Sequence, residues 1–388
     1  MTEIAVVHCG QLVPVSGPIV EDGAFVIRGG KVDWVGKTDE VPKGLEEFDA
    51  QGMVVTPGLV DAHTHTVFAG NRLDEFEWRS KGATYQEIAE NGGGIRSTMN
   101  ATRDCEDLKT QVKKHQLRLV RNGTTTFETK TGYGLKPELE LQHLEVADAG
   151  VATVKKTFLG AHALPPEFEG NLEGYINALI EILPEAKKLG ASAVDAFIEA
   201  GYFTPEVTRL YLQTAKKLGM EVHLHVDQLG PQKGAQFAAE MKATTADHLE
   251  YTDEEGIRAL FVAGVTPVLL PASVYGLGKT KYPDAKAMMK AGLPFCLATD
   301  YNPGSSPTPS LPFVMGLACR YMGMTPAQAL VACTSIPSQT LGLGDRKGSI
   351  SPGFDADFVI WPYKDYREIA YWIGDVMPER VAIAGEFI

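Results

Sequence analysis

The chain has 388 residues, a formal net charge of −13 and 44% hydrophobic residues. This composition is that of a globular protein with a substantial core, and the length allows one large domain or two smaller ones. The acidic balance argues against nucleic-acid partners, which select a basic patch. Because no apolar run suits a bilayer span or a signal peptide, we expect a cytoplasmic protein without membrane partners.

Residues 1–57 are predicted to form short strands separated by glycine pairs. The stretch FVIRGGKVDWVG is typical of a tight hairpin around Gly29-Gly30. The segment that follows residue 346, with GSISPGFDADFVIW and RVAIAGEFI, has the same character. Neither segment is long enough to bury its own core. We therefore expect residues 1–57 and 346–388 to join in one small, β-sandwich-like domain.

An apolar run that ends in His-Thr-His follows, in TPGLVDAHTH at residues 56–65. Alternate side chains of a strand point to one face, so His63 and His65 could bind one metal ion. A catalytic ion needs roughly three or four protein ligands and a position for water. Taken alone, the pair is equally compatible with two structural histidines.

The middle of the chain repeats one pattern: a helical stretch, a glycine and a short apolar run. Such runs follow Gly123, Gly150, Gly190, Gly219, Gly264 and Gly292, and two more lie at 59–65 and 243–251. Glycine readily takes the left-handed conformation of the residue that follows a helix. Helix starts are indicated by Thr-Pro at 204–205 and at 325–326 and by Thr252 with Glu255. Strands that alternate with helices pair in parallel. Eight such units over residues 58–345 predict an α/β fold of the (β/α)8 TIM-barrel type.

Polar residues stand where these predicted strands end. In a barrel, the carboxyl ends of the strands converge on one mouth, where active sites lie. Packing alone does not explain five histidines and an aspartate at the ends of separate strands. These residues are His63, His65, His162, His225, His248 and Asp300.

With these motifs the chain resembles the amidohydrolase superfamily and, within it, the imidazolonepropionases of histidine degradation. The superfamily is indicated by TPGLVDAHTH, by LATD at 297–300 and by GSISPGFDADFVI. The narrower family is indicated by VFAGNR, GTTTFETKTGYGL, TFLGAHALP, LHVDQL, ADHLEY and ATDYNPGSSP, so that the resemblance covers essentially the whole chain. It implies hydrolysis of the cyclic amide of 4-imidazolone-5-propanoate to N-formimidoyl-L-glutamate.

The resemblance implies that the metal ligands are His63, His65, His225 and Asp300. Three imidazoles and one carboxylate suit Zn²⁺ or Fe²⁺. No lysine ends the TFLGAHA or the DAFIEA strand, so a carbamylated lysine between two ions is not expected, and we predict one divalent metal ion. His223 shares the inward face of His225, but His225 lies nearer the strand end and is the favoured ligand.

The resemblance also implies the positions that contact the substrate and carry the reaction. The substrate positions are Arg72, Tyr133, His162, Gln228, Asn302, Gly304 and Ser305, and the catalytic positions are His248, Asp300 and His162. Arg72 would bind the propionate, although a surface ion pair is the ordinary role of a lone arginine. His248 would orient the nucleophile and Asp300 would pass its proton to the leaving ring nitrogen. Either His162 or Tyr133 would hold the carbonyl oxygen.

Two positions depart from the family pattern. Gln228 stands where related deaminases have a proton-shuttling glutamate, and because an amide only donates and accepts hydrogen bonds, we predict that it recognises the N–C–N unit of the ring. The segment at 271–283 lacks the Phe-Tyr pair that the family more often has. We therefore expect the wall of the substrate pocket to differ from the family pattern there.

Two other classes of function stay open at this point. One is another mononuclear-metal cyclic amidohydrolase or a heterocycle deaminase, against which Arg72 and the GYG element argue. The other is a non-catalytic barrel scaffold, which the retained set of four ligands disfavours. We expect a homodimer.

Overall fold

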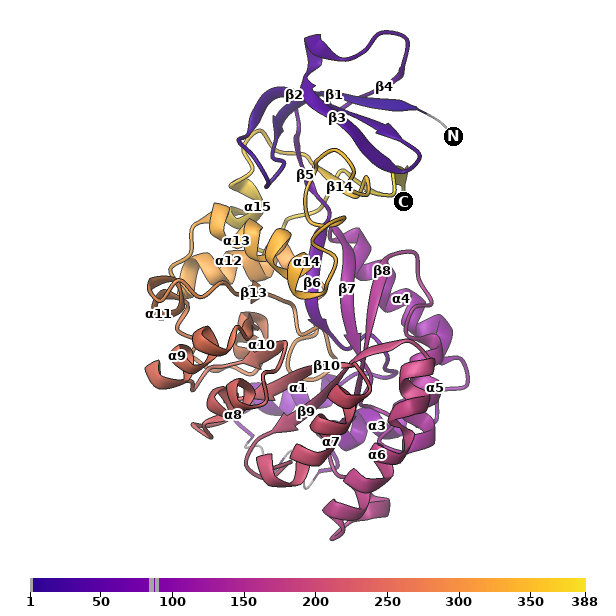
Figure 1. Cartoon of the computed structure of the whole chain (residues 1–388), viewed down its shortest axis with the longest axis vertical. Helices are drawn as coiled ribbons and strands as arrows, with labels where there is room; N and C mark the ends of the chain where they lie inside the picture. Colours follow the sequence, from indigo (N-terminus) through magenta and orange to yellow (C-terminus); the bar gives the residue numbers. More distant parts are fainter. Residues whose placement is uncertain (1–2, 84–86, 88–90) are drawn as a thin grey trace.

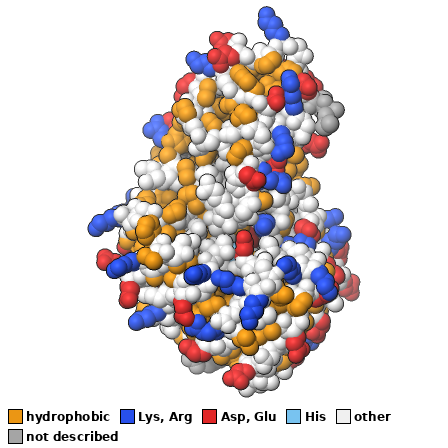
Figure 2. Space-filling view, viewed as in Figure 1, with side chains coloured by type: hydrophobic (Ala, Val, Ile, Leu, Met, Phe, Trp, Pro, Cys, Tyr) orange, Lys and Arg blue, Asp and Glu red, His pale blue; other side chains and the backbone are white. Residues whose placement is uncertain are grey.

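Two β-sheets organise the protein, and the computed structural model describes residues 3–83, 87 and 91–388. A barrel with its surrounding helices forms the larger lobe, and a smaller lobe of strands contains both chain ends (Figure 1). On the face drawn in Figure 2, acidic and basic side chains are intermingled, with apolar side chains scattered among them.

The larger lobe is built on eight strands that pair in parallel and in sequence order. Their bounds are β6 Leu59–Thr64, β7 Thr124–Lys130, β8 Thr153–Ala161, β9 Ala191–Ile198, β10 Glu221–Val226, β11 Thr245–His248, β12 Thr266–Leu269 and β13 Cys296–Leu297. The first and last strands meet just beyond β13, where the Asp300 N–H donates to His63 O at 3.0 Å and the His65 N–H to Tyr301 O at 2.9 Å. This nearly closed barrel confirms the predicted fold, and all eight predicted strands lie in it.

Helices alternate with these strands and surround the barrel (Figure 1). Their bounds are α1 Leu73–Ser80, α3 Ile95–Arg103, α4 Leu108–Arg121, α5 Pro137–Val146, α6 Leu172–Lys188, α7 Pro205–Lys217, α8 Gly234–Glu240, α9 Glu254–Ala263, α10 Pro271–Gly276, α11 Ala285–Lys290, α12 Leu311–Tyr321, α13 Pro326–Ala332, α14 Ser335–Thr340 and α15 Glu368–Tyr371, with 3-10 turns η1 Thr38–Glu40 and η2 Pro166–Phe168. Over the described ranges, none of the helices combines the length and the apolar character that crossing a membrane demands.

The predicted helix starts can be compared with the caps in the structure. Thr204 and Thr325 cap α7 and α13 through their hydroxyl groups, which confirms both Thr-Pro starts. The predicted cap at Thr252 is wrong by one residue, since Asp253 caps α9 instead. The Thr252 side chain is directed toward Asp227 and not toward the helix, since its hydroxyl donates to Asp227 Oδ2 at 2.8 Å.

Both ends of the chain contribute to the second, mixed sheet. Its strands are β1 Ile4–Leu12, β2 Val20–Arg28, β3 Lys31–Lys37, β4 Glu46–Asp49, β5 Val54–Pro57, β14 Phe358–Trp361, β15 Arg380–Ile383 and β16 Glu386–Phe387. β14 pairs antiparallel with β5, and the buried Trp361 donates from Nε1 to Thr56 Oγ1 at 2.9 Å. The predicted hairpin is formed by β2 and β3, and Gly29 and Gly30 take φ values of 58° and 76° in its two-residue turn.

One residue, Gly58, separates the terminal sheet from the first barrel strand. A Cβ atom there would lie 2.1 Å from Thr125 Oγ1, so the close approach of the start of β6 to β7 requires glycine. Apolar side chains such as Phe158, Val194 and Leu224 belong to the main hydrophobic core. Buried within the barrel strands are also charged side chains: Asp61, Glu128, Lys130, Asp195 and Asp247.

Candidate metal centre

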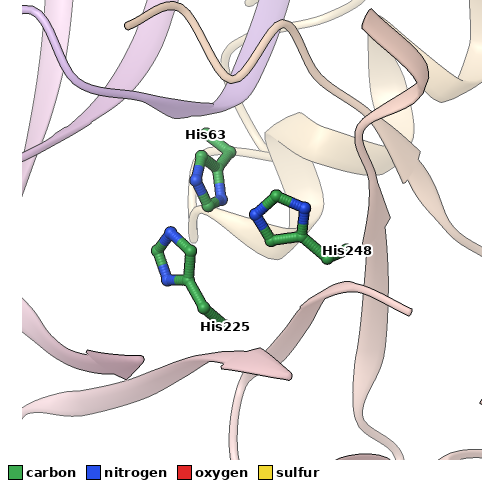
Figure 3. A group of neighbouring side chains, drawn as sticks. All are labelled: His63, His225 and His248. Carbon is green, nitrogen blue, oxygen red and sulfur yellow. The ribbon is translucent and has the colours of Figure 1, made fainter. Parts of the chain in front are cut away.

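Two barrel strands and the segment after β13 supply the residues predicted to bind metal. β6 carries His63 and is followed at once by His65, while β10 carries His225. Asp300 comes three residues after β13 and is held against β6 by the backbone bonds that close the barrel. Figure 3 shows His63, His225 and His248 pointing toward one another from three different strands.

The spacing of the ligand atoms tests whether these side chains fit an ion. His63 Nε2 lies 3.2 Å from His65 Nε2, and Asp300 Oδ1 lies 3.5 Å from the first nitrogen and 3.4 Å from the second. Atoms that bind a tetrahedral ion at about 2.0–2.1 Å are about 3.3–3.4 Å apart. The three buried side chains therefore already have the spacing of one coordination shell, and they fit a divalent metal ion.

His225 and His223 have different neighbours, although both face inward from β10. The His225 ring lies 4.5 Å from that of His63 between centroids, and nitrogens of His63, His225 and His248 come within 4.8 Å of one another. His223 Nδ1 instead lies 3.2 Å from Glu128 Oε1. Burial alone would lower the pKa of His223, but its hydrogen bonds to Glu128 and Glu221 raise it to about 9. The geometry favours His225 as the third imidazole ligand.

Asp300 and His248 both have a left-handed backbone, with φ values of 52° and 79°. Such conformations cost roughly 1–3 kcal/mol in residues other than glycine and cluster at functional sites. The Ser305 hydroxyl donates to Asp300 Oδ2 at 3.0 Å, which leaves Oδ1 facing the histidines. Burial alone would raise the pKa of Asp300, but its hydrogen bond with His65 and the electrostatic influence of the neighbouring imidazoles lower it to about 2, so it is a carboxylate at neutral pH.

The candidate catalytic side chains surround this cluster. The His162 ring stacks on that of His65, with centroids 5.5 Å apart, and its Nδ1 lies 2.9 Å from Gly132 O. Tyr133 lies 5.5 Å from His162 between ring centroids, and burial raises the pKa of its hydroxyl. His248 Nδ1 lies 3.4 Å from Glu250 Oε1. All three predicted positions thus lie beside the candidate metal ligands.

The predicted substrate positions after Asp300 form one tight loop. The Asn302 amide donates to Asp300 O at 2.6 Å, and its Oδ1 accepts from the Gly304 and Ser305 N–H groups, both at 2.8 Å. In the structure, therefore, the Asn302 side chain shapes the loop that carries Asp300. The segment at 271–283 begins with α10, where a Cβ on Gly276 would lie 2.1 Å from Ser305 O, so this helix packs directly against the same loop.

Arg72 also contacts this loop. Its Nε donates to Thr98 Oγ1 at 2.8 Å and lies 3.7 Å from Glu75 Oε1. A Cβ on Gly304 would lie only 2.2 Å from Arg72 Nη1, so the guanidinium and this glycine are in direct contact. Gln228, the remaining predicted position, is 9% exposed, and its backbone N–H donates to a Glu199 carboxylate oxygen.

Three charged residues that the sequence analysis did not single out contact the candidate ligands or each other. Asp247 Oδ2 lies 2.7 Å from His63 Nδ1, and Asp195 Oδ2 lies 3.0 Å from His225 Nδ1. The third, Lys130, contacts both aspartates. A signal was present in the sequence, since a charged residue inside a buried strand needs a partner, but the sequence does not say which strand supplies it.

Comparison with known proteins agrees with this geometry. The sequence profile of the amidohydrolase family matches residues 54–388. The chain is 44% identical over 414 residues to an imidazolonepropionase of Solibacter usitatus, covering 100% of this chain and 99% of that protein. It is 42% identical over 385 residues to an imidazolonepropionase of Geobacillus kaustophilus, covering 95% and 91% of the two chains.

Solved structures with similar folds share far less sequence. A 5-methylcytosine deaminase from Klebsiella pneumoniae superposes with a TM-score of 0.76 at 18% identity, covering 99% of this chain and 97% of that one. A Xaa-Pro dipeptidase superposes with a TM-score of 0.74 at 16% identity and 100% coverage of both chains. At these identities the likeness shows the shared fold alone.

Proposed function

We propose that this chain, which belongs to the amidohydrolase family and within it to the imidazolonepropionases, acts in histidine degradation. It hydrolyses the ring amide of 4-imidazolone-5-propanoate to N-formimidoyl-L-glutamate. The observation that carries the proposal is the buried group of His63, His65 and Asp300, whose ligand atoms have the spacing of a coordination shell. Arg72, which contacts the loop that carries Asp300, adds a cation for the carboxylate of the substrate.

We infer that one divalent ion, Zn or Fe, is held by His63, His65, His225 and Asp300. When bound, such an ion lowers the pKa of water toward neutrality and so supplies the nucleophile for attack on the ring carbonyl. The histidines supply neutral nitrogen donors, because burial lowers the pKa of His63 well below its usual value and also lowers that of His65.

Proton transfer in this proposal belongs to Asp300, with His248 as the orienting residue. Asp300 Oδ1 faces the ligand histidines while Oδ2 accepts from Ser305, so the carboxylate is fixed in one orientation. It takes a proton from the attacking water and gives it to the ring nitrogen as the C–N bond breaks. His248, close to His63 and His225, holds the nucleophile in line with the carbonyl carbon.

The choice between Tyr133 and His162 as donor to the developing oxyanion follows from their hydrogen bonds. The Gly132 carbonyl can only accept, so His162 donates to it from Nδ1. A neutral imidazole has one N–H, which leaves His162 Nε2 as an acceptor, and burial lowers the pKa of His162 well below its usual value. Tyr133 keeps its proton, so we assign the oxyanion contact to Tyr133 and a ring-recognition role to His162.

Substrate recognition is assigned to both sides of the metal centre. Arg72 binds the propionate through its guanidinium, and its fixed position, with the side chain 11% exposed, favours a bidentate contact. Gln228 donates to and accepts from the N–C–N unit of the ring. Gly304 and Ser305 line the same side as Arg72 and complete the contact surface.

The test is a substrate assay of the metal-loaded protein. Protein reconstituted with Zn²⁺ or Fe²⁺ should convert imidazolonepropionate to formimidoylglutamate, and chelated protein should not. An imidazolone that lacks the propionate should react far more slowly, because it has no partner for Arg72. Equal turnover of both rings would contradict the proposed substrate and favour a cyclic amidohydrolase or deaminase that does not read a carboxylate.

We also infer that residues 1–57 and 346–388 form one domain, residues 58–345 the other, and that the protein is a homodimer. The dimer is supported by large exposed apolar side chains close together in sequence, namely Tyr371, Trp372, Ile373 and Met377. Sedimentation equilibrium should give twice the 42.0 kDa chain mass. A monomer at micromolar concentration would refute the dimer.

A further inference from the structure

Lys130, at the end of β7, is an ammonium group with no access to solvent. Its Nζ lies 2.8 Å from Glu128 Oε1, 2.8 Å from Asp195 Oδ2 and 3.3 Å from Asp247 Oδ2, and all four side chains are 0% exposed. A buried charge is costly unless it is paired, and lysine is among the residues least often fully buried. The position therefore needs an explanation beyond packing.

Two of the three oxygens that Lys130 contacts, those of Asp195 and Asp247, also face candidate metal ligands. Asp247 Oδ2 lies 2.7 Å from His63 Nδ1, and Asp195 Oδ2 lies 3.0 Å from His225 Nδ1. The His63 Nδ1 atom is hydrogen-bonded to Asp247, whereas the His225 Nδ1 atom lies at ion-pair distance from Asp195 without hydrogen-bond geometry. In both rings Nδ1 is directed at a carboxylate, which leaves Nε2 for an ion. Metal-binding histidines depend on such contacts of the other ring nitrogen for their orientation.

Which of the two Asp247 oxygens Lys130 contacts distinguishes a positioning role of Lys130 from simple neutralisation of buried negative charge. Asp247 Oδ1 is buried and has no hydrogen-bond partner among the described residues. Lys130 nevertheless contacts the other oxygen, Oδ2, which is also hydrogen-bonded to His63 Nδ1. An ammonium that only balanced charge would lie equally well beside the unpartnered oxygen. One Nζ atom instead connects the two carboxylates, on β9 and β11, that contact His225 and His63.

We propose that Lys130 is a positioning residue of the metal centre, which fixes Asp195 and Asp247 and through them the imidazoles of His63 and His225. This inference rests on the proposed metal site and names a further residue that tunes it. Replacement of outer contacts of metal ligands typically weakens metal binding by 10–100-fold, and the same range is expected when Lys130 loses its ammonium group.

A second buried lysine provides a matched control. Lys347 has a side chain 3% exposed, and its Nζ lies 2.6 Å from Asp357 Oδ2 and 3.2 Å from Asp355 Oδ2. Lys347→Met therefore also removes a buried ammonium from two aspartates, but these contact none of the candidate ligands. Lys130→Met takes the shared ammonium group from three buried carboxylates, so Lys130→Met with Glu128→Gln is the companion variant that reduces the excess negative charge and retains Asp195 and Asp247.

The experiment measures metal binding, independent of turnover. Zn²⁺ affinity is obtained by competition with a chromophoric chelator, and Co²⁺-substituted protein gives the ligand-field absorption bands. Both Lys130 variants should bind Zn²⁺ about 10–100-fold more weakly than wild type and show altered Co²⁺ bands, while Lys347→Met should match wild type in both.

The outcomes separate this inference from the proposed function. A wild-type protein that binds no divalent ion would refute the proposed function itself. A folded Lys130 variant with affinity within twofold of wild type and unchanged Co²⁺ bands would overturn the inference alone. Failure of both Lys130 variants to fold, where Lys347→Met folds, would also overturn it, because Lys130 would then serve the barrel and not the metal ligands.

Discussion

Gly304→Ala isolates the contact between the loop after β13 and the Arg72 guanidinium. The new Cβ would lie 2.2 Å from Arg72 Nη1 and 2.7 Å from Cζ, whereas ordinary contacts begin at 3.4 Å, so the guanidinium must move by about 1 Å. Gly304 is not among the glycines with positive φ, so alanine causes no backbone strain. A shift of this size in a substrate-positioning group costs on the order of 100-fold, or about 2.7 kcal/mol.

The assay compares kcat/KM for imidazolonepropionate with that for an imidazolone without the carboxylate. We expect about a 100-fold loss for the first substrate and little change for the second. Gly17→Ala is the control, because nothing lies within 4 Å of its new Cβ. Arg72→Met should itself weaken substrate binding by roughly 2–4 kcal/mol.

A double-mutant cycle decides whether the two residues act together. In the Arg72→Met background, Gly304→Ala should have little further effect, because the atoms it displaces are gone. A full loss in that background, or an equal loss with the uncharged analogue, would show that Gly304 acts through the loop that carries Asp300 and would refute the reasoning.

Three further predictions concern the metal, the catalytic carboxylate and the terminal sheet. Elemental analysis should find about one tightly bound divalent ion per chain, since three histidines and one aspartate supply the ligands of a single ion that also binds water; two ions, both required for turnover, would contradict this. Asp300→Asn should lower kcat by at least about 100-fold while a product-like ligand still binds, because it removes the proton acceptor; near-normal turnover would exclude the role. Trp361→Phe should lower the free energy of unfolding by about 1–3 kcal/mol in urea titrations, because it removes the bond to Thr56 and buried volume; an unchanged midpoint would contradict that account.

The sequence was sufficient for the features that depend on local pattern. Glycines after helices and apolar runs located the eight barrel strands, and the alternation in His-Thr-His placed His63 and His65 on one face, where their Nε2 atoms are 3.2 Å apart. Lys130 and Asp247 escaped notice for a physical reason. Apart from Glu128, which lies two residues before Lys130 on β7, their partners Asp195 and His63 lie on other strands, and no local spacing records that these side chains meet.

The same limit applies to the ends of elements and to the loop after β13. Thr252 has the residue type of a helix cap, but a tertiary bond directs its hydroxyl toward Asp227. Asn302 has the residue type of a ligand contact, and only the folded loop reveals that its amide bonds to Asp300 and to two backbone N–H groups. In both cases a neighbour distant from the local motif decides what the side chain does.

The closure of the barrel between β6 and the segment after β13 has a consequence for how the protein is made. The backbone N–H of Asp300 is hydrogen-bonded to the carbonyl of His63, although the two residues are more than half the chain apart in sequence. During synthesis from the N-terminus, His63, His65 and His225 emerge well before Asp300. If the ligand set is the proposed one, a chain truncated before β13 lacks Asp300, and we expect firm metal binding to require the joining of the first and last strands. On the proposed ligand set, we expect the ion to stabilise the completed barrel more than any shorter chain, because binding to the folded state alone shifts the folding equilibrium.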